Sequence, residues 1–466
     1  MIPRAAIDQR VREWGLRHGV VEKDYVLGWL LWGIGGHPVL GRSWIFKGGT
    51  CLKKCYIETY RFSEDLDFTI IDGGPIDPAD VAPLLAEVLA SVSDGSGIDF
   101  SDRQPTLKAR RQPGSVEGRV YYRGPLAAPA VASVKLDLSA TELLAREPER
   151  RPIAHPYAPD ESLPEPADVA CYAFEEVFAE KLRAMGERSR PRDLYDIVNL
   201  YRRDDLRIRR DDIHAILVEK CAHKGIGVPT LASIDASGLV PELESEWENM
   251  LGHQLPALPP FEQFWDALGD LFRWLDGAEI APALAPLGTA ANEDVLWTPP
   301  PTVGVWGTDI PLEEIRFAAV NHLCVELGYQ GSTRLIEPYS LRRTRDGNLV
   351  LHALRHESGE HRSYRVDRIQ SAHATSVPFT PTYAVEFSSA GPLAAPPSTR
   401  RSTTATRAPR HRRTTRTGPV YVIECPLCGK RFDRTTHSRK LNAHKNPYGT
   451  RCPGQGRTGY LVDTRW

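Results

Sequence analysis

Two acidic side chains stand two positions apart in a short apolar segment, and a glycine pair precedes them. The segment KGGT covers residues 47–50, and RFSEDLD covers residues 61–67. In a β-strand alternate side chains point to the same face, so Asp65 and Asp67 would lie side by side. Such carboxylates repel each other unless a divalent cation lies between them. Mg²⁺ takes oxygen ligands and shares them with substrate phosphates, so the pair predicts a site for Mg²⁺ (or Mn²⁺).

The glycine pair predicts a phosphate-binding turn. A Gly-Gly turn after a strand lets the backbone approach a phosphate chain, and the N-terminus of a following helix favours anions. Alone, a glycine pair usually marks only a turn, and a D-x-D pair usually marks a solvated strand edge. Their order of strand, turn, helix and strand favours a site. The residues expected to bind nucleotide here are Lys47, Gly48, Gly49, Thr50, Arg61 and Ser63, although Ser63 would equally suit a cap of the turn.

A third carboxylate, Asp137, lies in a further predicted strand (ASVKLDLSA, 132–140). It would complete the metal site or act as base on an attacking hydroxyl.

The elements that must position these residues follow from hydrophobic periodicity. Helical patterns cover residues 5–34, 78–92 and 173–185, a further helix begins at Pro191, and helices continue from 206 to 276. Strand patterns cover residues 43–49, 65–71 and 132–140. This alternation predicts an α+β fold with a mixed sheet and helices.

These motifs together resemble the AbiEii/AbiGii-type nucleotidyltransferase toxins of the DNA polymerase β-like superfamily. Residues 21–25 (VEKDY) resemble the family's N-terminal signature, residues 176–182 its third motif, and residues 190–196 (RPRDLYD) its fourth, where Arg192 stands for the family's frequent Lys. The resemblance spans roughly residues 1–275. It implies a minimal nucleotidyltransferase core and a helical lobe that closes over the nucleotide.

The family transfers a nucleotidyl group from an NTP to an acceptor, in some members the tRNA 3′ end. The resemblance therefore implies a growth-arresting toxin of a type IV toxin–antitoxin or phage-defence system, restrained by an antitoxin. It gives Lys181 the basic position and Asp193 the acidic position. Lys181 and Arg192 would offset triphosphate charge, and Asp193 would orient Lys181 or the nucleotide. Asp196 more often serves as a structural partner to an arginine. Alone, Lys181 would more often belong to a solvated Glu/Lys helix face.

The sequence pattern changes after an Ala/Pro-rich linker at 278–308. Residues 309–387 show short β-like runs, and Asp346-Gly347 between apolar runs predicts a hairpin. Residues 323–369 resemble a WYL domain, a small SH3-like β-barrel, although the three-letter signature is absent. In that family an arginine cluster binds a nucleic-acid strand or a nucleotide-like ligand. The matching residues are Arg334, Arg355 and Arg365, and solvated surface arginines are the alternative.

The chain ends in a compact Cys/His unit (420–466) after a basic linker (388–419) expected to be disordered. Cys425 and Cys428 form a Cys-x-x-Cys pair, and His444 and Cys452 follow, which suits tetrahedral Zn²⁺ with the second ligand pair on a helix. His437 is the alternative third ligand, and a redox pair or unliganded thiols are the alternative to a metal. The resemblance is to a C2HC zinc knuckle. Basic residues around it, including Lys430, Arg431 and Arg434, favour binding of nucleic acid, either tRNA or DNA.

Charge divides along the chain in the same way. Residues 391–466 hold 16 Lys and Arg against 3 Asp and Glu, which leaves 42 basic and 57 acidic groups in the remaining 390 residues. The most apolar stretch, residues 26–36, is too short for a bilayer span, which needs about 20 residues. With scattered cysteines and no apolar signal segment, we expect a cytoplasmic protein without a membrane partner.

Two hypotheses from different classes follow. The first is a nucleotidyltransferase with a catalytic core (1–205), a helical lobe (206–277) and two nucleic-acid-binding modules. The second is a regulatory or sensor protein whose core only binds a nucleotide. The intact aspartate pair favours the enzyme.

Overall fold

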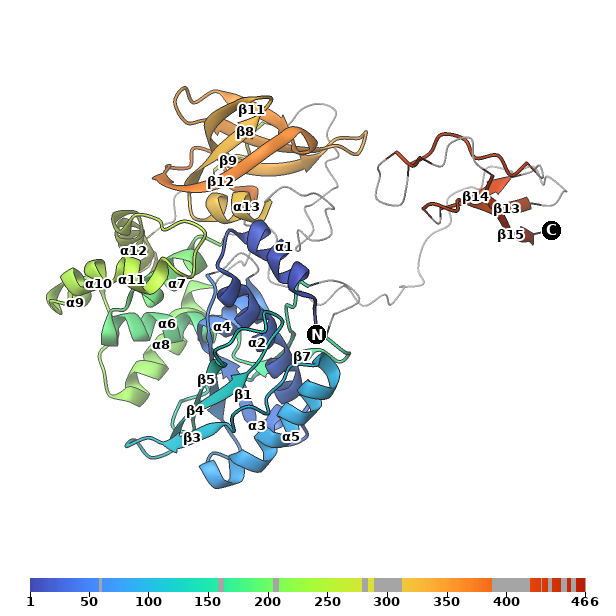
Figure 1. Cartoon of the computed structure of the whole chain (residues 1–466). Helices are drawn as coiled ribbons and strands as arrows, with labels where there is room; N and C mark the ends of the chain where they lie inside the picture. Colours follow the sequence, from blue (N-terminus) through green and yellow to red (C-terminus); the bar gives the residue numbers. More distant parts are fainter. Residues whose placement is uncertain are drawn as a thin grey trace, which may run out of the picture. The chain divides into compact units, whose positions relative to one another are not determined.

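The computed structural model divides into two compact units, residues 1–397 and 398–466 (Figure 1). The residues it describes are 1–57, 61–157, 163–203, 209–278, 284–288, 312–387, 420–428, 430–434, 438–445, 451–453 and 458–465. Most of the two predicted linkers, and the alternative zinc ligand His437, lie outside these residues.

A seven-stranded mixed sheet forms the centre of the first unit, in the order β3-β4-β5-β2-β1-β7-β6. The central strand β2 pairs with β1 antiparallel and with β5 parallel. This arrangement places the two predicted aspartate-bearing strands next to each other. The strands are β1 (Trp44–Lys47), β2 (Asp65–Ile70), β3 (Thr106–Ala109), β4 (Ser115–Tyr122), β5 (Ala132–Ser139), β6 (Glu149–Pro152) and β7 (Asp168–Cys171).

Helices surround this sheet and form a lobe beside it. Helix α2 packs on α5 and β7, whereas α6, α7, α8 and α12 pack on one another. The predicted helices at 78, 173, 191 and 261 are confirmed. The helices before the barrel are α1 (Arg4–Trp14), α2 (His18–Gly36), α3 (Leu40–Ser43), α4 (Gly48–Cys51), the π-helical turn Leu52–Tyr56, α5 (Pro78–Ser96), α6 (Phe174–Arg188), α7 (Pro191–Tyr201), α8 (Arg210–Lys224), α9 (Leu231–Ala236), α10 (Val240–Ser245), α11 (Trp247–Leu251) and α12 (Phe261–Leu275).

The helical prediction for residues 5–34 is confirmed except at residues 15–17, where the chain divides into two helices. Gly15 adopts a left-handed conformation (φ 64°) and ends α1, and its amide bonds back to the carbonyl of Val11. This is a common way for a helix to stop, because glycine has no Cβ to resist a positive φ. Helix α2 starts three residues later and is buried on nearly every side.

Residues 312–387 form a five-stranded antiparallel sheet in the order β11-β10-β9-β8-β12, as predicted for the barrel. The hairpin at Gly347 (φ 85°) joins β9 to β10 and is confirmed. Helix α13 (Leu312–Val320) packs on β8, β9 and β12 and on α1, and every one of its residues is buried. The strands are β8 (Leu323–Tyr329), β9 (Ser332–Arg343), β10 (Leu349–Arg355), β11 (His361–Arg365) and β12 (Ile369–Pro378).

The second unit is a three-stranded sheet, in the order β14-β13-β15. Its small core contains Ile423, Leu441 and Phe432. The helix expected to carry the second pair of zinc ligands is absent from the described residues, since His444 and Cys452 both lie in irregular segments. The strands are β13 (Val420–Glu424), β14 (Arg431–Arg434) and β15 (Tyr460–Arg465).

Candidate active site

A row of charged residues crosses the central strands on one face of the sheet. The strand registers place Lys47 opposite Asp67, and Asp67 opposite Asp137. Asp65 lies opposite Lys135 one step along the same face. The parallel pairing of β2 with β5 thus brings Asp137, the predicted third carboxylate, beside Asp65 and Asp67. In the sequence, 69 residues lie between Asp67 and Asp137.

The glycine turn packs directly against this row. Gly48 has φ 84°, and a Cβ at this position would stand 2.4 Å from Oδ2 of Asp67. Only glycine therefore allows the backbone to pass so close to the carboxylate. Thr50 is buried, and its hydroxyl donates to the carbonyl of Asp65 over 2.5 Å. Thr50 thereby ties the turn to β2, while its predicted contact with nucleotide stays a prediction.

The electrostatics of Asp67 fit a cation. Burial, together with the neighbouring carboxylates Asp137 and Asp65, raises the pKa of Asp67 to about 6, although Lys47 opposes the shift. Burial and like-charge repulsion disfavour the ionised form of this carboxylate, and a bound divalent ion would remove the repulsion. The oxygen donors of Asp65 and Asp67, on one strand face beside a phosphate-accessible turn, therefore suit Mg²⁺ or Mn²⁺.

Asp137 differs from the pair because cations already contact both of its oxygens. Lys135 Nζ lies 2.7 Å from Oδ2, and Arg110 contacts Oδ1. Arg110 also bonds to Glu117 on β4, over 3.2 Å. Among the described residues, Asp137 and the pair do not form a group of three ligands with all donor atoms within 4.8 Å of one another. Its two predicted roles, completing the metal site or acting as base on an attacking hydroxyl, stay predictions.

A buried ionic network lies on the helical side of the site. Lys181 Nζ lies 2.8 Å from Asp196 and 3.2 Å from Asp193. Burial alone would lower the pKa of Lys181, but these two carboxylates outweigh it and raise the pKa. Lys181 therefore stays protonated and contacts both carboxylates, while the predicted role of Asp193 in orienting Lys181 or the nucleotide stays a prediction.

Arg61 provides the arginine partner that was expected for Asp196. Its guanidinium makes two hydrogen bonds to Asp196, of 2.7 and 3.0 Å, and one of 3.0 Å to Gln254. Although burial opposes the shift, Arg61 and Lys181 lower the pKa of Asp196 to about 2. Arg61 is almost fully buried, so its contacts here are structural, and its predicted contact with nucleotide stays a prediction.

Two further arginines point at the same space. Arg188 bonds to Asp193 over 2.9 Å. Arg192 has no carboxylate within ion-pair distance among the described residues, and it bonds only weakly, over 3.5 Å, to the carbonyl of Met250. Burial, and then the positive charge of Arg61, lower its pKa. Arg192 is thus a cation that lacks a close anionic partner, as a triphosphate-binding residue should.

A cleft of about 530 Å³ joins these groups. Except for Thr50, every residue predicted for catalysis or nucleotide binding lines it. The lining residues are Lys47, Gly48, Gly49, Arg61, Ser63, Asp65, Asp67, Lys135, Asp137, Glu142, Glu180, Lys181, Arg183, Ala184, Glu187, Arg188, Arg190, Arg192, Asp193 and Met250.

The N-terminal motif VEKDY supports the site from behind. Lys23 bonds to Glu64, the residue before Asp65, over 2.7 Å. Asp24 forms a buried ion pair of 2.8 Å with Lys54, which follows the glycine turn. These contacts connect α2 to the segment before Asp65 and to the segment after the glycine turn. Sequence reasoning gave no site role to Lys135, Glu142, Glu180 and Arg188, although Lys135 (two residues before Asp137 in a strand) and Glu180 (within the third motif) carried a local signal.

A smaller hollow of about 290 Å³ lies on the barrel. Arg334 and Arg355 line it, as predicted, together with Glu326 and Glu357. Arg365 does not line this hollow and pairs with Asp367 over 2.7 Å. Only two of the three predicted arginines therefore come together.

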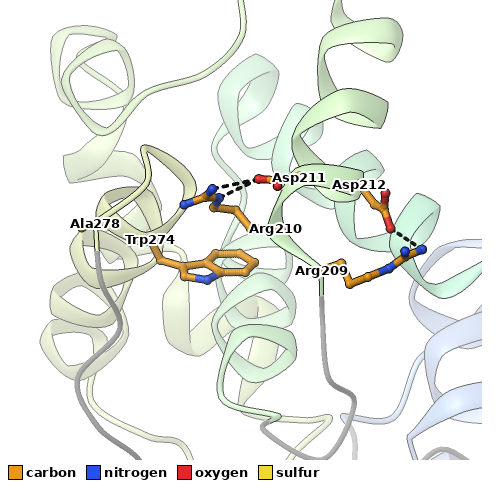
Figure 2. Close-up of a pocket in the computed structure, with 6 residues that line it drawn as sticks. All are labelled: Arg209, Arg210, Asp211, Asp212, Trp274 and Ala278. Atoms are coloured by element: carbon orange, nitrogen blue, oxygen red, sulfur yellow. Dashed lines mark hydrogen bonds and ion pairs between the residues drawn. The ribbon is translucent and has the colours of Figure 1, made fainter.

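Another hollow, beside the start of α8, is less suited to an anion (Figure 2). Arg209 and Arg210 line it with Trp274. Both arginines are already paired with carboxylates, Arg210 with Asp211 over 2.9 Å and Arg209 with Asp212.

The four predicted zinc ligands meet in the second unit. Their donor atoms all lie within 4.8 Å of one another. Cys425 Sγ lies 3.8 Å from Cys452 Sγ, and Cys428 Sγ lies 3.5 Å from His444 Nε2. The other ring nitrogen of His444 lies 2.8 Å from the carbonyl of Asn442, which leaves Nε2 free for a metal. Burial opposes ionisation of Cys425, but backbone amides of Leu427 and Cys428 lower its pKa to about 7.

The basic residues predicted near this centre lie at its surface. Arg431 pairs with Glu424 over 2.6 Å, and Lys430 donates to the carbonyl of Lys445. Arg434 donates to the carbonyl of Ser438 over 3.4 Å. Their contact with nucleic acid stays a prediction.

Two family models match the first unit, one over the central sheet and helical lobe and one over the barrel. A model of the family described as "Nucleotidyl transferase AbiEii toxin, Type IV TA system" matches residues 29–269, and a WYL domain model matches residues 311–374. Among solved structures, MenT4, a nucleotidyltransferase toxin from Mycobacterium tuberculosis H37Rv, is 20% identical with a TM-score of 0.37, over 60% of this chain and 91% of that chain. Comparison with curated proteins gave no match. No described helix is long and apolar enough to cross a bilayer.

Proposed function

The chain belongs to the AbiEii family of nucleotidyltransferase toxins of type IV toxin–antitoxin systems, and we propose that it transfers a nucleotidyl group from an NTP to the 3′ end of an RNA, with tRNA as the leading acceptor. The observation that carries the proposal is the cleft in which Asp65 and Asp67 face Gly48, Lys181 and Arg192. Carboxylates on one side and cations on the other match a metal–triphosphate complex.

Each group has a separate task in this proposal. Gly48 and Gly49 let the triphosphate approach the sheet, and Lys181 and Arg192 neutralise the charge of its oxygens. Asp65 and Asp67 would hold Mg²⁺ (or Mn²⁺), which would supply stabilisation of the attacking and leaving oxygens. Asp137 accepts the proton of the attacking hydroxyl, which attacks the α-phosphorus in line while pyrophosphate leaves.

The acceptor is proposed from the other two regions. The hollow with Arg334 and Arg355 would contact a phosphate backbone or a nucleotide-like ligand. The zinc-binding unit and its basic residues would add sequence-independent phosphate contacts, which weaken as salt rises. A cognate antitoxin is the further partner that family membership implies, and Zn²⁺ would hold the small second unit folded.

The test is incubation of the full chain with Mg²⁺, labelled NTPs and total tRNA. We expect label on RNA, loss of label with Asp65→Ala, and normal labelling with Asp94→Ala, an exposed aspartate on α5. Nucleotide binding without labelling of any acceptor would contradict transfer and favour a regulatory nucleotide-binding role. Metal analysis of Cys425→Ser should show loss of about one equivalent of zinc.

A further inference from the structure

Three metal-ligand side chains meet on the barrel, and none of them belongs to the catalytic cleft or to the Cys/His unit. Cys324 lies on β8, Glu337 on β9 and His356 just after β10. Their donor atoms all lie within 4.8 Å of one another. We propose that these three residues form a second transition-metal site, which binds Zn²⁺ or a similar borderline divalent ion.

The strand register explains why these residues meet. Val325 pairs with Ile336, so Cys324 and Glu337, one step further along each strand, share a face. The amide of His356 donates to the carbonyl of Leu335 over 3.1 Å, which places its ring beside them. The three ligands thus come from three adjacent segments of one sheet, which is a rigid support.

The distances suit tetrahedral coordination. Nδ1 of His356 lies 3.4 Å from Sγ of Cys324 and 2.9 Å from Oε1 of Glu337. Ligands at usual zinc distances and tetrahedral angles stand about 3.6 Å apart for sulfur and nitrogen and about 3.4 Å for nitrogen and oxygen. The nitrogen–sulfur and nitrogen–oxygen distances differ from these values by about 0.2 and 0.5 Å. The same ring nitrogen of His356, Nδ1, faces both the thiol of Cys324 and the carboxylate of Glu337. The imidazole therefore cannot pass a proton from one of these groups to the other through its two nitrogens.

The surroundings hold the carboxylate in a metal-ligating orientation. Tyr339 donates toward the second oxygen of Glu337 over 3.3 Å and is itself held by Thr382, whose amide lies 3.2 Å from the tyrosine oxygen. Tyr339 is fully buried. Such outer partners fix ligand orientation in metal sites.

The donor set and its exposure indicate the metal and its access. Sulfur and imidazole favour zinc-like ions over Mg²⁺. The side chain of His356 is 34% exposed, so an ion can reach the site from solvent. Three protein ligands leave a fourth position open for water or a small anion. By contrast, a buried cluster of Cys51, Cys55 and Cys171 has no exposed member.

The experiment uses the full chain with Cys425→Ser and Cys428→Ser, so that the Cys/His unit no longer contributes. After Co²⁺ loading, we expect a visible d–d band and a thiolate-to-cobalt band, and loss of about one equivalent of metal when Cys324→Ser or His356→Gln is added. Matched controls are Cys221→Ser and His214→Gln on α8, which should keep both bands.

His356→Gln keeps the test valid if the buried Cys324→Ser variant fails to fold. Glu337→Gln should weaken Co²⁺ binding by at least tenfold while leaving the thiolate band detectable at saturation. A folded protein that takes up no Co²⁺, or bands that persist in His356→Gln and Cys324→Ser, would overturn the proposal.

Discussion

Replacement of Asp67 by Asn should stabilise the metal-free fold while abolishing transfer. The pKa of Asp67 is raised to about 6 in the folded protein by burial and by Asp137 and Asp65. An unfolded aspartate has a pKa of about 3.9, and each unit corresponds to about 1.4 kcal/mol, so ionisation at pH 7.5 costs at most about 3 kcal/mol. Since the carboxylate borders an open cleft, solvent screening reduces this cost to about 1–2 kcal/mol.

The sign follows from proton uptake. Between the unfolded and folded pKa values the folded state holds more protons, so the free energy of unfolding of the wild type falls as pH rises through about 6. Asn does not ionise and avoids this loss. The advantage of Asp67→Asn should therefore be full at pH 7.5 and shrink to about a third at pH 4.5.

Urea unfolding of the full chain in Mg²⁺-free buffer at both pH values measures this difference, with Asp94→Asn as the matched control. Mg²⁺ should restore the stability of the wild type and leave Asp67→Asn unchanged. If Asp67→Asn is destabilised at pH 7.5, or gains equally at both pH values, the reasoning about the carboxylate cluster is refuted.

Three other changes address different parts of the chain. Gly48→Ala should raise the KM for NTP at least tenfold, measured by labelling, because its Cβ would meet Asp67. Arg61→Met should lower the free energy of unfolding by about 2–3 kcal/mol, measured in urea, since buried Asp196 loses two charged hydrogen bonds and keeps only Lys181 as a cationic partner; Arg61→Met with Asp196→Leu should recover part of this loss. Deletion of residues 391–466 should leave a folded core, weaken RNA binding and flatten its salt dependence; unchanged affinity would refute the role of that region.

Local patterns predicted the site because its chemistry lies in short segments. Asp65 and Asp67 share a strand, Gly48 lies one short connection away, and the resemblance placed Lys181 and Asp193. The fold predicted around them is confirmed in its strands and most of its helices. The break between α1 and α2 was not predicted, because the helical pattern continues through it. A single glycine, Gly15, turns the chain there.

Long-range pairing accounts for what could not be predicted. An arginine partner for Asp196 was expected, but its identity, Arg61, depends on packing between distant segments. Likewise, Arg110, which directly follows β3, reaches Asp137 on β5 only because β3, β4 and β5 are neighbours. The ligand set of Cys324, Glu337 and His356 has no motif spacing, since a strand register assembles it.

Helix α13 has a consequence for how this chain could be divided. Its residues are all buried, and it contacts the barrel strands as well as α1 of the catalytic core. Its last turn also joins the helical lobe, because the carbonyl of Asn321 accepts a hydrogen bond of 3.2 Å from Gln263 on α12. A catalytic fragment cut before Leu312 would bring an apolar face into water and favour aggregation. The core and the barrel therefore share one buried interface and are best expressed together.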